Sequence, residues 1–300
     1  MFHHREDQLM KGIYNIMVTP FDGNDRIDEE SLRSVVDFQV SKGAHGLTIL
    51  GLLGEGQKLS DAERDLVIDV VMDQVKGRIP VVVTTSHMSP SVVIERSKRA
   101  KELGAEGVMI SPPTLLRNMD AVTQFYATLK KELDMPIVVQ DEPVATNVIM
   151  PASFLANNGL PIIKLEDPPV PQKITQILNQ NPDAQILGGL GGQYFIEELE
   201  RGAVGTMTGF AFTEALIEMY DLFNAGKQQE ARDLFYKYTP ILRYEGQANV
   251  SVSIRKEILK RRGAIKNADV RSPGAKLDAP GMEELTKLLD YTVQVTGNPL

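Results

Sequence analysis

The sequence contains no cysteine. Disulfide bonds, thiolate nucleophiles and cysteine-ligated metals are therefore excluded. Long hydrophobic runs are also missing, since none approaches the ~18 apolar residues that a membrane-spanning helix needs. The first twelve residues, MFHHREDQLMKG, lack the apolar core of a signal peptide. We therefore expect a cytoplasmic protein without a membrane partner.

Basic residues are fewer than acidic residues. The chain has 32 Lys and Arg against 40 Asp and Glu, which gives a net charge of −8. An acidic surface disfavours nucleic acid and anionic membranes as partners. An anionic small molecule would therefore need a local site made from a cationic side chain or from backbone N–H groups. The 300 residues suit two ordinary domains or one α/β barrel with an extension.

Short apolar runs alternate with helical patterns along the first two thirds of the chain. Strands are expected at 12–21, 46–50, 79–85, 107–110, 136–140, 162–165, 184–187 and 203–207. Alternation at this spacing is typical of βαβ units, and eight of them predict a closed (β/α)8 TIM barrel. The alternative is a doubly wound open sheet, but no Gly-x-Gly-x-x-Gly follows the first strand, as a dinucleotide site would need.

The expected helices carry their own end signals. Within the barrel they lie at 28–42, 61–75, 91–103, 119–133, 151–157, 171–180 and 193–201. Ser60 and Glu63 are spaced as a capping box, and Gly43 and Gly104 stand just past helices, as C-terminal capping glycines do. Beyond residue 212 only helical patterns follow, at 213–225, 228–242, 252–262 and 280–295. We predict a barrel over residues 1–212 and a C-terminal helical domain over residues 213–300.

One of these strands contains a lysine. Residues 161–167 read PIIKLED, so Lys164 interrupts an apolar run that resembles a buried parallel strand. Burying an ammonium group is costly unless it is paired or loses its proton. One interpretation is an edge strand, or a lysine whose stem reaches solvent. The other is an amine nucleophile that forms a Schiff base. This segment alone leaves both open.

Polar and glycine-rich segments follow the expected strands, where barrels of this kind carry their sites. The loops 51–56 and 188–192 are rich in glycine, so their N–H groups can converge on an anion, or their glycines only make tight turns. His87 suits acid–base work or a structural place at the surface. Glu166 lies two residues beyond Lys164, and in a regular strand the two side chains share a face. Glu166 would then either pair with the lysine or act as a base.

Several segments match a known family. They are MVTPF at 17–21, GLLGE at 51–55, LSDAER at 59–64, GAEGVMISPP at 104–113 and IIKLED at 162–167. Through them the chain resembles the dihydrodipicolinate synthase/N-acetylneuraminate lyase superfamily of class I aldolases and dehydratases, essentially from end to end. The resemblance implies a (β/α)8 barrel with a C-terminal helical domain, in a homotetramer. It also implies that Lys164 forms an imine with a 2-oxo acid, without metal or added cofactor.

The chain departs from that family at three places. Leu52 and Leu53 stand where two hydroxyl residues are usual, and Gln140 stands where a proton-passing tyrosine usually ends the fifth strand. Thr114 and Leu115 lie where a tyrosine often reaches a neighbouring subunit. An amide cannot replace a tyrosine that passes protons. The departures therefore disfavour a lysine-biosynthesis synthase and a sialic acid lyase.

The segments VVQDEP, TTSH and GQYFIEEL are more similar to the family branch that acts on 2-keto-3-deoxy sugar acids. We therefore expect a lyase that dehydrates such an acid, for example L-2-keto-3-deoxyarabonate. The catalytic candidates are Lys164, Gln140, His87, Glu166 and Asp141, with Glu142 as a further acid or base. The substrate-binding candidates are Leu52, Leu53, Gly54, Gly189 and Thr208. The alternatives are a synthase-like or aldolase reaction of pyruvate, and a barrel that binds a 2-oxo acid without turnover.

Overall fold

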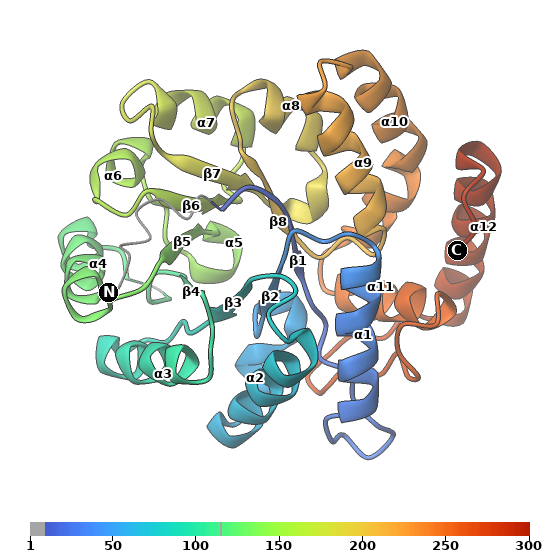
Figure 1. The fold of residues 1–300 in the computed structure, drawn as a ribbon, viewed down its shortest axis with the longest axis horizontal. Helices are drawn as coiled ribbons and strands as arrows, with labels where there is room; N and C mark the ends of the chain where they lie inside the picture. The colour runs from blue at the N-terminus through green and yellow to red at the C-terminus, as the bar shows by residue number, and fades with distance from the viewer. Residues whose placement is uncertain (1–9, 115) are drawn as a thin grey trace.

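A computed structural model describes residues 10–114 and 116–300, so Leu115 lies outside the described residues. Within them, parallel strands close into a barrel in sequence order, with β8 paired to β1 (Figure 1). The strands are β1 Gly12–Ile16, β2 Gly46–Ile49, β3 Val81–Thr84, β4 Gly107–Ile110, β5 Ile137–Asp141, β6 Ile162–Leu165, β7 Gln185–Gly188 and β8 Gly205–Thr208. The expected (β/α)8 barrel with a C-terminal helical extension is confirmed.

Helices follow the strands around the outside of the barrel. They are α1 Glu29–Ser41, α2 Asp61–Val75, α3 Pro90–Glu102, α4 Met119–Glu132, α5 Pro143–Thr146, α6 Ala152–Asn157, α7 Val170–Leu178, α8 Phe195–Glu200 and α9 Thr213–Asn224. Three short 3-10 helices lie in loops at the barrel mouth: η1 Leu52–Gly54, η2 Gly56–Lys58 and η3 Leu190–Gly192. Helix α9 packs against β1, so it also belongs to the ring around the barrel.

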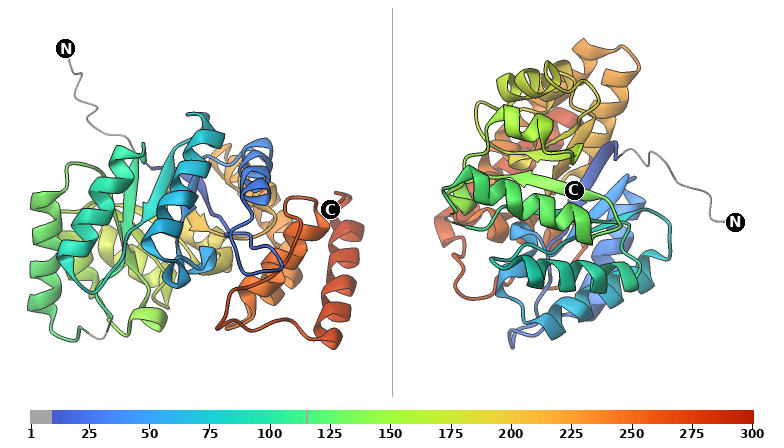
Figure 2. Two further views of the ribbon diagram at one scale, coloured as in Figure 1. Left: turned by 90° about the horizontal axis from the view of Figure 1, so that it is seen from below. Right: turned by 90° about the vertical axis from the view of Figure 1, so that its left-hand side faces the viewer.

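The remaining helices are α10 Gln228–Glu245, α11 Ser251–Arg261 and α12 Ala279–Thr296. They lie at one side of the barrel, with α12 outermost (Figure 1; Figure 2, left). Because α9 contacts both β1 and α10, it joins the ring to this extension. The domain boundary at residues 212 and 213 stays a prediction.

The local end signals act as expected. The Ser60 hydroxyl accepts the Glu63 N–H at 3.3 Å and the Glu63 carboxylate accepts the Ser60 N–H at 2.9 Å, which completes the capping box of α2. Gly43 and Gly104 have φ of +83° and +101°, in the left-handed region that a side chain disfavours. The first strand is shorter than the expected 12–21: β1 ends at Ile16, although the N–H of Met17 still donates to the carbonyl of Thr48 at 2.9 Å.

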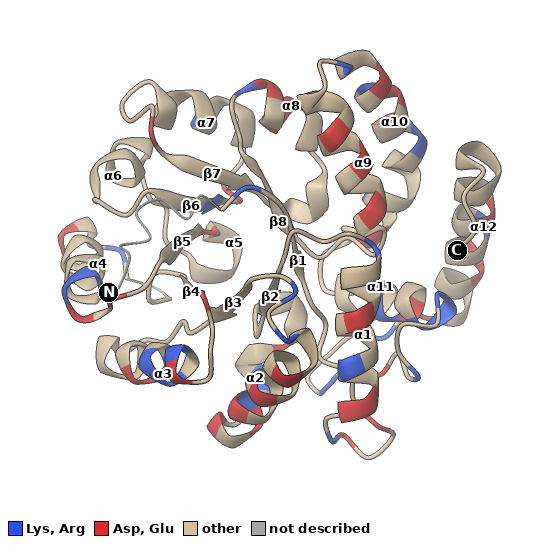
Figure 3. Ribbon diagram, in the orientation of Figure 1, with Lys and Arg blue, Asp and Glu red and all other residues tan. Residues whose placement is uncertain are grey.

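Charged side chains gather on the surrounding helices, while the strands are mostly uncharged (Figure 3). Every residue of β1 to β6 is buried, as a barrel wall covered on both faces requires. In the part of the chain that the structure describes, no helix is long and apolar enough to cross a membrane.

Candidate active site

Strand alternation sorts the residues of β5 and β6 between two faces. Val138 and Ile162 belong to the apolar cluster inside the barrel, whereas Val139 and Ile163 belong to the larger core between strands and helices. Successive side chains of a strand point to opposite faces, so Gln140 and Lys164 point inward. These two residues are also register partners across β5 and β6. Strand alternation and register together thus bring an amide and an amine side by side inside the barrel.

The amine of Lys164 is buried and paired. Its side chain is 3% exposed, and its Nζ forms an ion pair with Oε2 of Glu166. The same oxygen accepts a hydrogen bond from Nε2 of Gln140 at 2.9 Å. Oε1 of Glu166 accepts the N–H of Leu190 at 3.2 Å, which ties the carboxylate to the loop after β7. One carboxylate therefore contacts the amine and is held in place by two further donors.

Gln140 is itself fixed by the neighbouring strand ends. The hydroxyl of Ser111, just after β4, donates to Oε1 of Gln140 at 2.9 Å. The N–H of Ser111 donates to the hydroxyl of Ser86, just after β3, at 2.9 Å. Because both ends of the amide have partners, its Nε2 is directed at Glu166. The hydrogen bonds run from β3 to β6 across the mouth of the barrel.

Gly189 lies behind Glu166. A Cβ atom at this position would stand 2.3 Å from Cγ of Glu166, much closer than nonbonded carbon atoms approach. Only a glycine lets the Glu166 side chain lie where it meets Lys164. Gly189 was predicted to bind substrate; its observed contact is with the carboxylate beside the amine.

A cavity of about 340 Å³ opens at this mouth. Lys164, Glu166, Gln140 and Glu142 supply its polar wall on one side. The remaining lining residues are Ile16, Leu52, Leu53, Met109, Leu190, Gly191, Gln193, Gly246, Ala248, Ser251 and Arg255. A volume of this size suits a small organic acid better than a macromolecule.

The loop after β2 forms another part of the wall. Gly54 is buried against the chain leaving β1, where its carbonyl accepts the Thr19 hydroxyl at 2.6 Å. A Cβ at Gly54 would lie 2.8 Å from the carbonyl oxygen of Met17, so the loop can approach this closely only with glycine. Leu52 and Leu53 begin the short helix η1, and both line the cavity. The first N–H groups of a helix have no acceptor within it, which leaves these two for a ligand.

Glu55 fixes this loop to the C-terminal extension. Its side chain is 1% exposed, and its carboxylate pairs with Nζ of Lys256 at 2.6 Å and Nζ of Lys58 at 2.8 Å. It also accepts the N–H of Arg271 at 3.0 Å. Burial lowers the pKa of Lys256 to about 8, although Glu55 acts in the opposite direction. A single buried carboxylate thus joins the β2 loop, α11 and the segment before α12.

Three predicted site residues, in addition to Gly54 and Gly189, do not line the cavity within the part of the chain that the structure describes. Two of them are Asp141 and His87. Asp141 points out of the barrel, where its carboxylate pairs with Lys173 of α7. His87 is exposed, and its Nδ1 accepts the N–H of Ser89 at 3.0 Å in the turn before α3. Their predicted catalytic roles stay predictions.

Thr208 and Glu142 lie at the last strand and at α5. Thr208 is buried at the end of β8, outside the cavity wall of the described residues. Glu142 lines the cavity, but its carboxylate also accepts the N–H of Ala145 at 2.7 Å and so caps α5. Burial raises the pKa of Glu142.

Three polar lining residues were not predicted: Gln193, Ser251 and Arg255. Ser251 and Arg255 are four residues apart on α11, so they share one face of that helix. This spacing is visible in the sequence. What the sequence does not contain is the direction of that face, because it depends on how α11 packs against the barrel.

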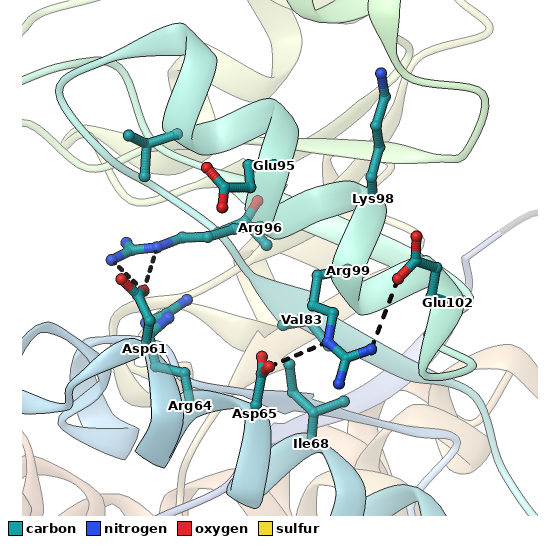
Figure 4. A pocket seen from close by; sticks show the side chains of 12 residues that line it. Asp61, Arg64, Asp65, Ile68, Val83, Glu95, Arg96, Lys98, Arg99 and Glu102 are labelled. Carbon is teal, nitrogen blue, oxygen red and sulfur yellow. Dashed lines mark hydrogen bonds and ion pairs between the residues drawn. The ribbon is translucent and has the colours of Figure 1, made fainter.

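A larger cavity, of about 490 Å³, lies outside the barrel between α2 and α3 (Figure 4). Its charged side chains pair with one another: Arg96 with Asp61 at 2.7 Å, and Arg99 with Asp65 at 3.0 Å. Arg64 is turned to the loops, where its guanidinium donates to the carbonyl of Gly56 at 3.0 Å. With most of its carboxylates held by arginines and no buried amine, this cavity is a weaker candidate than the barrel mouth, despite its size.

No group of three or more His, Cys, Asp or Glu side chains is placed to hold a metal ion anywhere in residues 10–114 and 116–300. The polar groups of the mouth are instead one amine, one guanidinium, two carboxylates and a set of amide and hydroxyl groups. Such a set can hold an organic acid, form a covalent bond through the amine and move protons through a carboxylate.

Comparison with known proteins places the chain among relatives with related names. A family model described as the dihydrodipicolinate synthetase family matches residues 9–292. L-2-keto-3-deoxyarabonate dehydratase of Azospirillum brasilense is 31% identical over 287 residues, covering 92% of each chain. 4-hydroxy-tetrahydrodipicolinate synthase of Methanospirillum hungatei is 28% identical over 245 residues, covering 78% of this chain and 84% of the relative. The crystal structure of dihydrodipicolinate synthase from Rhodopseudomonas palustris is 33% identical with a TM-score of 0.90, covering 94% of this chain and 97% of that chain.

Proposed function

We infer the function from the family and from the site: the chain belongs to the dihydrodipicolinate synthetase family, and it is a lyase of that family. The family resemblance read from its motifs is confirmed. We propose that it acts through an imine of Lys164 and dehydrates a 2-keto-3-deoxy sugar acid such as L-2-keto-3-deoxyarabonate. The observation that carries this proposal is the buried pair of Lys164 and Glu166, with the amide of Gln140 on the same carboxylate.

The reaction begins at the amine. Glu166 takes a proton from Nζ of Lys164, and the free amine attacks the C2 carbonyl of the 2-oxo acid. The carbonyl oxygen leaves as water when the imine forms. The imine withdraws electrons from C3, so a base removes a C3 proton and the C4 hydroxyl departs as water. A proton then moves from C5 to C3, which leaves an enol at C4 and C5. The enol loses its hydroxyl proton as C4 gains a proton, which gives the aldehyde, and hydrolysis by one water returns Lys164 and a 2-oxo semialdehyde. The overall change is the loss of one water molecule.

Glu166 is the carboxylate best situated for these proton transfers. It contacts the amine directly, so it lies beside the carbon atoms next to the imine. Gln140 has no exchangeable acid–base function, and its hydrogen bond orients Glu166. Glu142 also lines the cavity and is the second candidate. The N–H groups of Leu52 and Leu53 are proposed to hold the substrate carboxylate.

A pyruvate-dependent synthase or aldolase reaction is the alternative, and the names of two relatives favour it. Against it stands Gln140, because an amide cannot do the work of a proton-passing tyrosine. A protein that binds a 2-oxo acid without turnover would keep the cavity but would not need a buried amine beside a carboxylate.

The test starts with pyruvate and sodium borohydride, followed by measurement of intact mass. We expect a reduced adduct on the wild-type protein and none on Lys164→Ala, although Lys173 and Lys256 are also buried amines. Lys164→Ala should stay folded and keep less than ~1% of the rate, since it loses the covalent catalyst. An adduct on Lys164→Ala, or none on the wild type, would refute the imine mechanism. Loss of water from 2-keto-3-deoxypentonates, measured against release of pyruvate, then separates dehydratase from aldolase.

The same proposal includes the setting of the enzyme. We propose a homotetramer in the cytoplasm that needs no metal or added cofactor, since the imine itself withdraws the electrons. Light scattering of the purified protein checks the assembly. Dialysis against a chelator should leave the rate unchanged, and a rate restored by added metal would contradict the proposal.

A further inference from the structure

The cavity has a second polar end, formed by the C-terminal extension. Gly246, Ala248, Ser251 and Arg255 line it from the turn after α10 and from α11, and Gln193 joins them from the loop after β7. Nothing in the imine chemistry uses these residues. Three of them, Gln193, Ser251 and Arg255, carry side-chain hydrogen-bond donors, and all come from segments other than the strand that carries Lys164.

Arg255 has one hydrogen-bonding group without a partner. Its residue is 3% exposed, and its Nε and Nη2 both contact Oε1 of Glu245, at 2.7 and 2.6 Å. Its Nη1 is buried and has no hydrogen-bond partner among the described residues. Buried charged donors are nearly always satisfied, so an unpaired one on a residue that lines a cavity points to an acceptor that the protein itself does not supply.

The position of Nη1 supports this. A Cβ on Gly209 would lie 2.6 Å from Nη1 and 2.8 Å from the carbonyl oxygen of Ile16. The guanidinium therefore ends beside the carboxyl ends of β1 and β8, at the mouth of the barrel. Ile16 also lines the cavity. Nη1 is thus held at the same opening as the reactive amine, not on the outer surface.

Charge decides which oxygen fits. Glu245 already balances Arg255, and Glu166 already balances Lys164. Glu142 adds another carboxylate to the wall. The cavity therefore has a charged donor but no surplus positive charge, a combination that suits a neutral hydroxyl and disfavours a second carboxylate.

We propose that Nη1 of Arg255, with Ser251 and Gln193 beside it, forms a subsite for the hydroxyl end of the substrate. This inference rests on the proposed function, because it assigns the end remote from the imine. It makes Arg255 a specificity-determining residue that selects 2-oxo acids ending in hydroxyl groups over those ending in a carboxylate.

Arg255→Lys is the variant that tests it. A lysine keeps a positive charge for Glu245 but cannot also supply the Nη1 donor. We expect the ratio of kcat/KM for a 2-keto-3-deoxypentonate to the rate of borohydride trapping of pyruvate to fall about 10- to 100-fold, as for one hydrogen bond to a charged donor. 2-Oxoglutarate ends in a second carboxylate, so it should compete poorly with pyruvate for trapping by the wild type. In Arg255→Lys its competition with pyruvate should change by less than about twofold.

Arg262→Lys is the matched control. Arg262 is also a buried arginine near the end of α11, paired with Glu214, but it does not line the cavity within the described residues. Its substitution should leave the ratio within about twofold, and thermal unfolding of both variants checks that they are folded. An unchanged ratio in a folded Arg255→Lys, or an equal fall in Arg262→Lys, would overturn the proposal.

L-Arabonate separates this inference from the imine mechanism, because it carries the hydroxyl groups but has no ketone. Its binding, measured by calorimetry, should weaken by the same 10- to 100-fold in Arg255→Lys. If pyruvate is not trapped but L-arabonate binding depends on Arg255, the proposed function fails and the subsite stands. If pyruvate is trapped and neither ligand distinguishes the variant, the subsite fails and the function stands.

Discussion

Glu166 contacts the amine of Lys164, which loses a proton in the proposed mechanism, and Gln140 contacts Glu166 on the same oxygen. Their contributions to rate should therefore differ in size. Glu166→Gln is expected to lower kcat by ~10²–10⁴-fold, because it removes a general acid–base. Gln140→Leu removes one orienting hydrogen bond and should cost ~10-fold. Steady-state dehydration kinetics measure both.

Glu142→Gln serves as the control for this pair, since Glu142 lines the same cavity but caps α5. We expect it to cost less than Glu166→Gln. The assignment is wrong if Gln140→Leu is as damaging as Lys164→Ala while Glu142, Glu166, Asp141 and His87 all tolerate replacement.

Asp141 should act on stability rather than on rate. Burial raises its pKa from 3.8 to about 6, even though Lys173 attracts the ionised form. The folded protein thus holds this proton more tightly than the unfolded chain does. Its contribution to stability is fully present below pH 3.8 and is lost as pH rises through about 6. Asp141→Asn removes this dependence.

Urea unfolding at several pH values between 4 and 7 measures it. Between those limits the wild type should lose on the order of 2 kcal/mol of unfolding free energy relative to Asp141→Asn. Parallel pH profiles would contradict the shift. A variant that stays folded but loses ~10²-fold in rate would instead support the predicted catalytic role of Asp141.

The β2 loop is the element in which this chain departs most visibly from its family. If backbone N–H groups of η1 hold the substrate carboxylate, the side chain of Leu53 is not needed there. Leu53→Thr should be tolerated and, by adding a hydroxyl donor, tighten pyruvate binding by ~1 kcal/mol. The concentration dependence of borohydride trapping measures this. A pyruvate complex with its carboxylate away from the loop would refute the idea.

Elements with strong local signals were predictable, and their partners in space were less so. The barrel followed from the spacing of apolar runs, and the capping box of Ser60 was readable from two residues. Alternation along β5 also separates Gln140 from Asp141, so their different faces were available from the sequence. The exposure of His87 was not, because it depends on the course of an irregular turn. The short helix α5 had no periodic pattern long enough to predict it.

At the scale of the whole molecule, the site joins residues from Ile16 to Arg255. No local pattern indicates that α11 meets the barrel mouth, because that contact depends on packing between segments more than 200 residues apart in the chain, as between Glu55 and Lys256. Arg255 was therefore missed although its sequence neighbours were correctly predicted to be helical. The lysine was found because its strand is itself unusual.

Glu55 holds this long-range arrangement, so it is the place to test it. Glu55→Gln leaves Lys256 buried without its carboxylate, and breaking a buried pair in this way costs ~3–5 kcal/mol. Glu63→Gln is the matched control, because Glu63 pairs with Arg271 at the partly exposed edge and should cost less than ~1 kcal/mol. Urea unfolding compares the two. Equal losses would mean that the Glu55 cluster contributes no more than a surface pair.

The Glu55 cluster also sets an order of events during translation. Glu55 leaves the ribosome more than 200 residues before its partners Lys256 and Arg271. A nascent chain that already contains the barrel strands and Lys164 therefore still lacks the contacts that fix the β2 loop beside the amine. Because the loop borders the cavity, the candidate site is completed only after Lys256 and Arg271 have emerged, and a fragment that stops before them lacks the contacts that assemble the pocket around Lys164.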